Sequence, residues 1–89
     1  MFYVYVLFCA DHKLYIGFSE DLKRRIDEHQ KGRVISTKHR RPLQLIYYEC
    51  YCNGQDAKAR EVYLKSGGGH REFKKQNKNE LKRLGYQCL

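Results

Sequence analysis

Arg25 and His29 are the first residues whose types and spacing could do chemistry. A helix predicted after Ser19 places Leu22, Arg25, Ile26 and His29 at positions i, i+3, i+4 and i+7, on one face. An arginine on a core-facing stripe is costly to desolvate unless it meets an anion. That anion is either a protein carboxylate or a bound phosphate. The spacing leaves equally open a plain structural reading, in which Arg25 reaches a rim and His29 is a satisfied core histidine.

Two tyrosines precede this helix on predicted strands. Tyr5 lies on the strand Phe2–Cys9, and Tyr15 lies on the strand Leu14–Phe18. An odd loop, such as Ala10–His12, puts the two phenols on the same face of the sheet, whereas a two-residue loop separates them. By composition alone, such tyrosines are more often packing residues with a hydroxyl at the edge.

Glu61 is a further candidate, on a helix predicted from Asp56 to Ser66. The inward stripe of this helix brings either Arg60 or Glu61 to the sheet. A lone carboxylate there can be the salt-bridge partner of Arg25. It can equally hold a hard cation, because magnesium often takes only one or two protein carboxylates and keeps most of its waters.

The elements that must position these groups follow from apolar runs, caps and glycines. The hairpin formed by the two strands is followed by a helix that is capped by Ser19 and stopped by Gly32. A strand over Leu43–Cys52 comes next, and then a helix that is capped by Asn53 and ended by Gly67–Gly69. A last helix is predicted over His70–Leu84. This order, β-β-α-β-α-α, predicts an α+β fold with a small three-stranded antiparallel sheet flanked by helices. We expect residues 1–89 to form a single domain.

Composition narrows the class of partner. The chain has 89 residues, 18 Lys and Arg against 10 Asp and Glu, and a net charge of +8. A chain this basic expects polyanionic partners, with nucleic acid first and anionic membrane second. Its 8 Tyr and 4 Phe provide enough large side chains to close a core, unlike a disordered basic tail.

The sequence predicts neither a structural zinc site nor a membrane-spanning segment. The cysteines form no C-x-x-C pair and the histidines have no ligand spacing. Cys9, Cys50 and Cys52 fall in apolar runs and are expected to pack as small hydrophobes, while reduced thiols fit a cytoplasmic protein. The apolar run Met1–Ala10 is far shorter than the roughly 20 residues that span a bilayer.

Cations in two segments predict a footprint for phosphates. One group lies in the loop before Pro42 and the other in the last predicted helix, and the residues expected to bind nucleic acid are Arg33, Lys38, His39, Arg40, Arg41, Lys74, Lys75 and Lys78. A solvated basic face explains the same pattern, and both interpretations can hold. The last helix also carries Asn77, which either faces the site or satisfies a local hydrogen bond, the second being favoured.

Taken in order, these motifs resemble the GIY-YIG nuclease family. The resemblance rests on Tyr3-Val4-Tyr5, Leu14-Tyr15-Ile16-Gly17, Leu22-x-x-Arg25-x-x-x-His29 and Glu61. It covers nearly the whole chain and is closest to short stand-alone bacterial members, which are similar to the nuclease domain of the UvrC repair protein. It implies catalytic roles for Tyr5, Tyr15, Arg25 and His29 and a metal-binding role for Glu61, with Asn77 as a weak match to a late asparagine of the family.

The implied function is a metal-dependent endonuclease that hydrolyses DNA phosphodiester bonds in repair, recombination or processing, with low intrinsic sequence specificity. Glu61 is expected to bind Mg2+, with Mn2+ as an alternative, and Arg25 to neutralise the pentavalent phosphorane. Tyr5 is the expected base, with Tyr15 and His29 as positioning groups. The expected partner is DNA, including branched or damaged DNA. The alternative is a non-catalytic nucleic-acid-binding module on the same fold.

Overall fold

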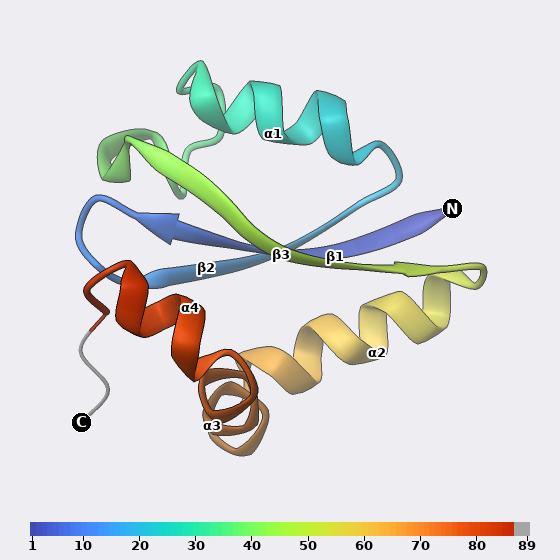
Figure 1. Cartoon of the computed structure of the whole chain (residues 1–89). Coiled ribbons are helices and arrows are strands. Elements are labelled where there is room, and N and C mark those ends of the chain that lie inside the picture. The colour runs from blue at the N-terminus through green and yellow to red at the C-terminus, as the bar shows by residue number, and fades with distance from the viewer. Residues whose placement is uncertain (87–89) are drawn as a thin grey trace.

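The computed structural model describes residues 1–86, which form a three-stranded sheet with helices on both faces (Figure 1). The antiparallel strands β1 (Phe2–Cys9), β2 (Leu14–Ser19) and β3 (Leu43–Tyr51) are arranged in the order β2-β1-β3. One face is covered by α1 (Leu22–Gln30), and the short 3-10 helix η1 (Lys38–Arg40) precedes β3. The other face is covered by α2 (Gly54–Lys65), α3 (Gly67–Gln76) and α4 (Lys78–Arg83). The predicted α+β class and three-stranded antiparallel sheet are confirmed.

The β1–β2 hairpin has an odd loop. Cys9 donates its N–H to the carbonyl of Lys13 at 2.9 Å, which leaves Ala10–His12 as the loop. Its last residue has a φ of 63°, the left-handed conformation that commonly closes loops of this length. Tyr5 and Tyr15 therefore lie on the same face of the sheet.

β1 is the centre of two cores because its side chains alternate between the faces of the sheet. The α1 face packs around Tyr5, Leu7, Cys9 and Leu43. The opposite face packs against α2 and α3 through Val4, Val6, Ile16, Ala57, Leu64 and Phe73.

A bulge in β3 changes which face its side chains meet. Val6 pairs with Tyr47 but Leu7 pairs with Leu45, so Ile46 is the extra residue. One extra residue reverses the alternation of a strand. Leu45 consequently packs toward α1, while Tyr47 packs toward α2.

The start of α1 differs from the prediction. Asp21, not Ser19, is the N-cap, and its side chain accepts a hydrogen bond from the N–H of Arg24 at 3.1 Å. Ser19 pairs with Tyr3 as the last residue of β2, and its hydroxyl bonds the backbone of Asp21 instead. The predicted stop at Gly32 is confirmed by its φ of 75°.

The glycine run begins a helix rather than ending one. Ser66 caps α3 by accepting a hydrogen bond from the N–H of Gly69 at 3.2 Å. A Cβ on Gly69 would lie 1.9 Å from the carbonyl oxygen of Tyr63, so only glycine allows α3 to pass this close to α2. The single helix predicted over His70–Leu84 is wrong, because Asn77 separates α3 from α4.

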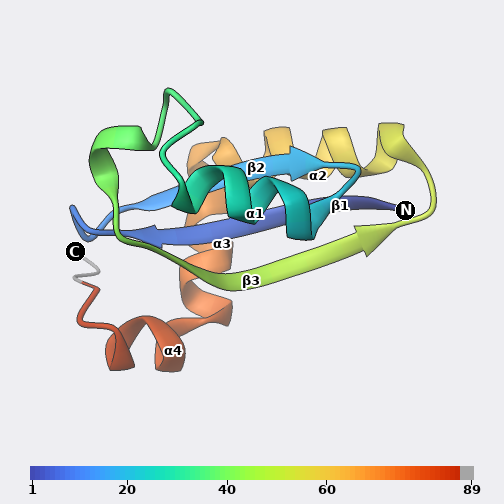
Figure 2. The ribbon, with the colours of Figure 1, turned by 90° about the horizontal axis from the view of Figure 1, so that it is seen from above.

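Seen from above, β2 and β3 form the two edges of the sheet (Figure 2). The segment between α1 and η1 projects on the β2 side, while α4 extends beneath the β3 side. Within residues 1–86, no helix has the length and apolar character needed to cross a membrane.

Candidate active site

Tyr5 and Tyr15 meet at the β2 edge because of the hairpin register. Tyr5 pairs with Gly17 and Leu7 pairs with Tyr15. A Cβ on Gly17 would lie 2.4 Å from Cζ and from Oη of Tyr5, so the phenol lies directly across the bare backbone of this glycine. The two tyrosine rings lie with their centroids 6.4 Å apart. A glycine is therefore needed at position 17, because any larger residue would collide with the Tyr5 side chain as it extends toward the β2 edge.

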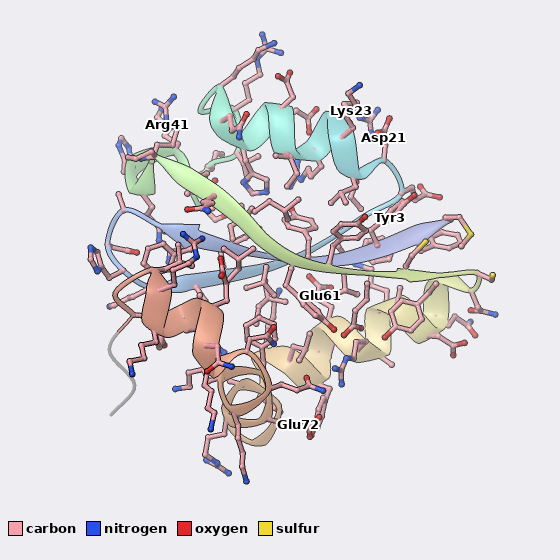
Figure 3. The ribbon with its side chains drawn as sticks, viewed as in Figure 1. Tyr3, Asp21, Lys23, Arg41, Glu61 and Glu72 are labelled. Carbon is pink, nitrogen blue, oxygen red and sulfur yellow. The ribbon has the colours of Figure 1, made fainter. Side chains whose placement is uncertain are left out.

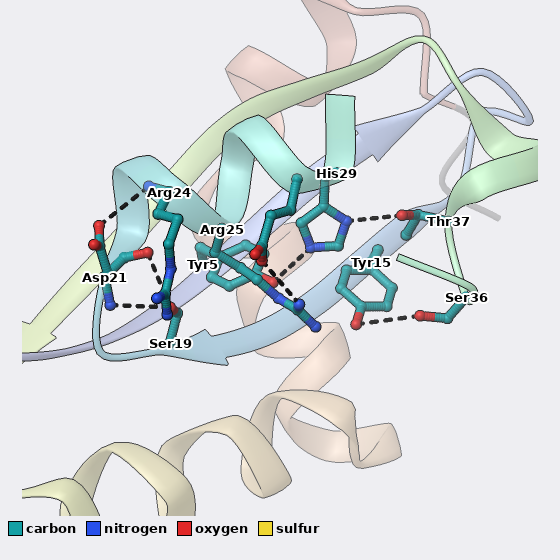
Figure 4. A network of polar contacts seen from close by, with 10 residues as sticks. Tyr5, Tyr15, Ser19, Asp21, Arg24, Arg25, His29, Ser36 and Thr37 are labelled. Atoms are coloured by element: carbon teal, nitrogen blue, oxygen red, sulfur yellow. Dashed lines mark hydrogen bonds and ion pairs between the residues drawn. The ribbon is translucent and has the colours of Figure 1, made fainter. Parts of the chain in front are cut away.

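His29 joins the two phenols from α1. It is fully buried, and its ring lies 5.5 Å from that of Tyr5 and 5.2 Å from that of Tyr15, centroid to centroid. Its Nε2 lies 2.7 Å from Oη of Tyr5, and its Nδ1 lies 2.7 Å from Oγ1 of Thr37 (Figure 4). The histidine therefore has hydrogen-bond partners at both ring nitrogens.

Both members of the buried Tyr5–His29 pair are neutral near pH 7. Burial raises the pKa of Tyr5 to about 12; the guanidinium of Arg25 offsets only part of this rise, and the charge of Glu61 adds to it. Burial, helped by the positive charge of Arg25, lowers the pKa of His29 to about 4. The family resemblance assigns the role of base to Tyr5, and burial of this phenol opposes the deprotonation which that role requires.

Arg25 lies at the mouth of this cluster. Its side chain is 37% exposed, and its Nη1 donates to Oε1 of Glu28 at 3.2 Å. The carboxylate partner is thus a neighbour on α1, and the predicted alternative of a salt bridge to Glu61 is wrong. Because an exposed i,i+3 pair is weak, Arg25 stays available to a bound phosphate.

Glu61 approaches from α2, on the other face of the sheet. Its side chain is only 13% exposed and lies between α2 and the sheet (Figure 3). The carboxylate is paired with Lys65 at 3.1 Å and with Lys58 at 3.8 Å. Arg60 is also half-buried, so the predicted choice between Arg60 and Glu61 is not exclusive.

Within the described residues, Glu61 is not part of a cluster of three acidic, histidine or cysteine side chains that could form a protein-only metal site. Among residues 1–86, no group of three or more such side chains could hold a metal ion. The exposed positions of Cys50 and Cys52 correct the expectation that they pack inside, whereas Cys9 is buried as expected. Cys88 lies outside the described residues.

The predicted phosphate-binding cations form two separate groups. Arg33, Lys38, His39, Arg40 and Arg41 lie on the α1 face, and Lys74, Lys75 and Lys78 lie on α3 and α4 beneath the sheet (Figure 1). The first group contains two structural arginines. Arg40 pairs with Asp11 at 2.8 Å, and Arg41 donates to the carbonyls of Lys38 and Gln30.

Asn77 satisfies a local hydrogen bond, which is the role that the sequence favoured. It follows the last residue of α3, and its Nδ2 donates to the carbonyl of Phe73 at 3.1 Å. Its place between α3 and α4 explains why the apolar stripe of the last predicted helix continues across a break.

Thr37 and Ser36 belong to the site but have no signal in the sequence. Thr37 is fully buried although it lies in a polar loop, because it bonds His29. The hydroxyl of Ser36 donates to Oη of Tyr15 at 3.4 Å, at the surface. Neither residue has a spacing that predicts these contacts, which depend on how the loop folds back over β2.

The site is an open edge rather than a cavity. A groove of about 1010 Å3 lies on the far side of α1, lined by Tyr3, Leu22, Ile26, Leu45 and Tyr48. Its lining carries the acids Glu20, Asp21 and Asp27 against the two cations Lys23 and Arg24, and so has no excess of positive charge to attract a polyanion. The cationic edge beside β2 is the surface that a long phosphodiester can reach.

The fold and the residues at this edge define a small α+β catalytic domain. Residues 1–79 match the model of the GIY-YIG catalytic domain, and the chain belongs to that family. Membership supports an endonuclease-type function.

Relatives and a solved structure agree with this assignment. The chain is 43% identical to a UPF0213 protein of Pediococcus pentosaceus over 81 residues, covering 90% of this chain and 85% of the relative. It is 40% identical to the UPF0213 protein in the ldhD 5′ region of Pediococcus acidilactici, covering 89% and 74%. The solution NMR structure of the UPF0213 protein BH0048 from Bacillus halodurans is similar with a TM-score of 0.53 and 30% identity, covering 82% of each chain.

Proposed function

We propose that this protein is a magnesium-dependent DNA endonuclease, with Mn2+ as an alternative ion and low intrinsic sequence specificity, acting in DNA repair, recombination or processing. The observation that supports this proposal is the convergence of Tyr5, Tyr15, Arg25 and His29 at one sheet edge, together with the half-buried carboxylate of Glu61 on α2. Phosphate contacts carry no sequence information, and a chain this small has few side chains to spare for base edges.

Glu61 fits the role of metal ligand. It supplies a hard carboxylate oxygen, and magnesium commonly uses one or two protein carboxylates with water completing its shell. The carboxylate is paired only with the ends of two flexible lysines, Lys58 and Lys65, which a divalent ion can displace. A bound ion would supply stabilisation of the negative charge on the scissile phosphate and the leaving oxygen.

Arg25 is assigned the binding of the phosphate. Its exposed guanidinium carries charge at the point where the pentavalent phosphorane develops additional negative charge. In the free protein Glu28 holds the side chain over Tyr5. Exchange of this weak carboxylate contact for a phosphate oxygen costs little because the pair is exposed.

Tyr15 is assigned the contact with the attacking water. A general base must reach the proton that it accepts, and the Tyr15 hydroxyl meets Ser36 at the surface, whereas Tyr5 is fully buried. In the proposal the Tyr15 oxygen accepts a proton of the attacking water and gives up its own proton to solvent, while the P–O3′ bond breaks and the leaving 3′ oxygen takes a proton from solvent. Tyr5 and His29 hold Tyr15 and Arg25 in place.

The test is a panel of duplex, nicked, branched and single-stranded DNA incubated with the protein in Mg2+, Mn2+ or EDTA. The proposal expects metal-dependent strand cleavage with a 5′ phosphate on the product. Salt-sensitive gel shifts without cleavage of any substrate would contradict it and favour the non-catalytic binding module.

A further inference from the structure

Ile35 is a large apolar side chain left in water beside the site. It is 89% exposed, the most exposed of the large hydrophobic residues in the described chain. Its neighbour Val34 is buried at 6% exposure and Thr37 is fully buried. The loop therefore directs Val34 and Thr37 inward and leaves Ile35 and Ser36 at the surface.

The loop that presents Ile35 is held at both ends. The N–H groups of Thr37 and Lys38 donate to the carbonyl of Val34 at 3.1 and 2.9 Å. The N–H of Arg33 donates to the carbonyl of Glu28 at 3.0 Å, and Thr37 is bonded to His29. A side chain on so constrained a turn loses little conformational freedom when it enters a partner.

The surroundings of Ile35 point to a nucleic acid. Arg33 and Lys38 flank it in the chain and are exposed, and the next residue, Ser36, bonds the hydroxyl of Tyr15. The loop projects on the β2 side, where the candidate site opens (Figure 2). A single isoleucine between cations is not the contiguous apolar patch that a protein partner needs. It matches the pattern of apolar wedges that enter a base step while nearby cations hold the phosphates.

We propose that Ile35 is a wedge that inserts between two bases next to the scissile phosphate. This inference rests on the proposed function and deepens it, because it names the substrate class. Unstacking a base step in continuous duplex is costly, whereas at a nick, gap or branch the step is already open. The wedge therefore selects DNA whose stacking is interrupted beside the cleavage site.

The test compares Ile35→Ser, Ile35→Leu and the control Val62→Ser. Val62 is another exposed β-branched residue, at 68% exposure, but lies on α2. Cleavage is measured on a continuous duplex and on the same sequence with a gap at the cut site. The second readout is the fluorescence of 2-aminopurine placed at that base step, recorded with the Glu61→Gln protein, because it needs binding but no cleavage.

The wedge predicts that Ile35→Ser lowers kcat/KM about tenfold on gapped DNA and less than about twofold on continuous duplex, so that the preference for interrupted stacking is lost. Ile35→Leu and Val62→Ser retain activity, and 2-aminopurine brightens only when Ile35 or Leu is present. Equal losses on both substrates, no loss on either, or unchanged 2-aminopurine fluorescence would overturn the wedge. If the parent protein cuts no DNA at all, the proposed function fails, and the fluorescence still decides the wedge.

Discussion

Two groups of side chains contain the same residue types, tyrosine, arginine and glutamate, but their glutamates have different partners. Beneath the sheet, Glu49 accepts hydrogen bonds from Tyr47, Tyr51 and both sides of the Arg60 guanidinium fork. Glu61, on α2, is paired among the described residues with Lys58 and Lys65 of its own helix, while Tyr5, Tyr15 and Arg25 lie on the α1 side of the sheet. The side chains of Glu49 and Glu61 are nearly equally buried, at 15% and 13% exposure.

The difference teaches what makes a buried carboxylate available for chemistry. Burial alone would raise the pKa of Glu49, but hydrogen bonds from Arg60, Tyr47 and Tyr51 lower it below its ordinary value. All its oxygens are thereby committed to the fold. Glu61 has equal burial but exchangeable partners, and so is free to take a cation. Residue type and burial do not separate the two groups, whereas hydrogen-bond saturation does.

Substituting each of the two glutamates by glutamine should produce the largest effects and tests the comparison most strongly. We expect Glu61→Gln to lower the rate of metal-dependent cleavage about a thousandfold while the midpoint of urea unfolding is unchanged. Glu49→Gln should have the opposite effect, because it leaves Arg60 half-buried without an anion and costs about 1–3 kcal/mol of stability. Nicking of plasmid DNA and urea titration measure both; similar cleavage by the two variants would remove the distinction.

Arg25 and Arg60 should differ in the same way, one affecting activity and the other stability. Arg25→Ala is expected to reduce cleavage about a hundredfold through lost phosphate stabilisation, with little change in stability, since its pair with Glu28 is exposed. Arg60→Ala should destabilise the protein by about 2 kcal/mol and leave the folded fraction active. Single-turnover rates and thermal unfolding give the two numbers, and equal stability losses would argue against this division.

His29 should make stability depend on pH in the acidic range. The pKa of His29 is about 4 in the folded protein and 6.5 in the unfolded chain. Between these two values the unfolded chain therefore binds a proton that the folded protein does not. The stabilisation is complete above pH 6.5 and should fall by about 2 kcal/mol between pH 7 and 5. Urea unfolding across this range tests it, with His29→Gln as the control in which the slope should flatten.

Gly17→Ala should have a moderate effect on stability. A Cβ at this position requires the ring of Tyr5 to move, which we expect to cost about 1–2 kcal/mol by overpacking. The same displacement should separate Tyr5 from His29 and reduce cleavage. Thermal unfolding and NMR shifts of the His29 ring follow the two consequences; an unshifted ring would show that the phenol does not depend on the bare backbone.

Much of the site was predictable because it depends on local periodicity. The helical spacing of Arg25 and His29 follows from a short stretch of chain, whereas the sequence left the loop parity behind Tyr5 and Tyr15 open until the structure showed an odd loop. The contact of His29 with Thr37, the bulge in β3 and the partner of Arg25 did not follow. Each depends on tertiary packing, where several donors and acceptors compete for one group. The same reason explains the glycine run, since Ser66 is a cap only when α3 turns against α2.

Binding of Mn2+ with a short DNA duplex, followed by NMR paramagnetic broadening, tests the availability of Glu61 most directly. The account predicts that amide signals of Glu61 and Gly17 broaden first, that those of Glu49 and Tyr47 broaden later, and that Glu61→Gln abolishes the early broadening. Broadening centred on β3, or an unchanged pattern in Glu61→Gln, would contradict the claim that the unsaturated carboxylate holds the metal.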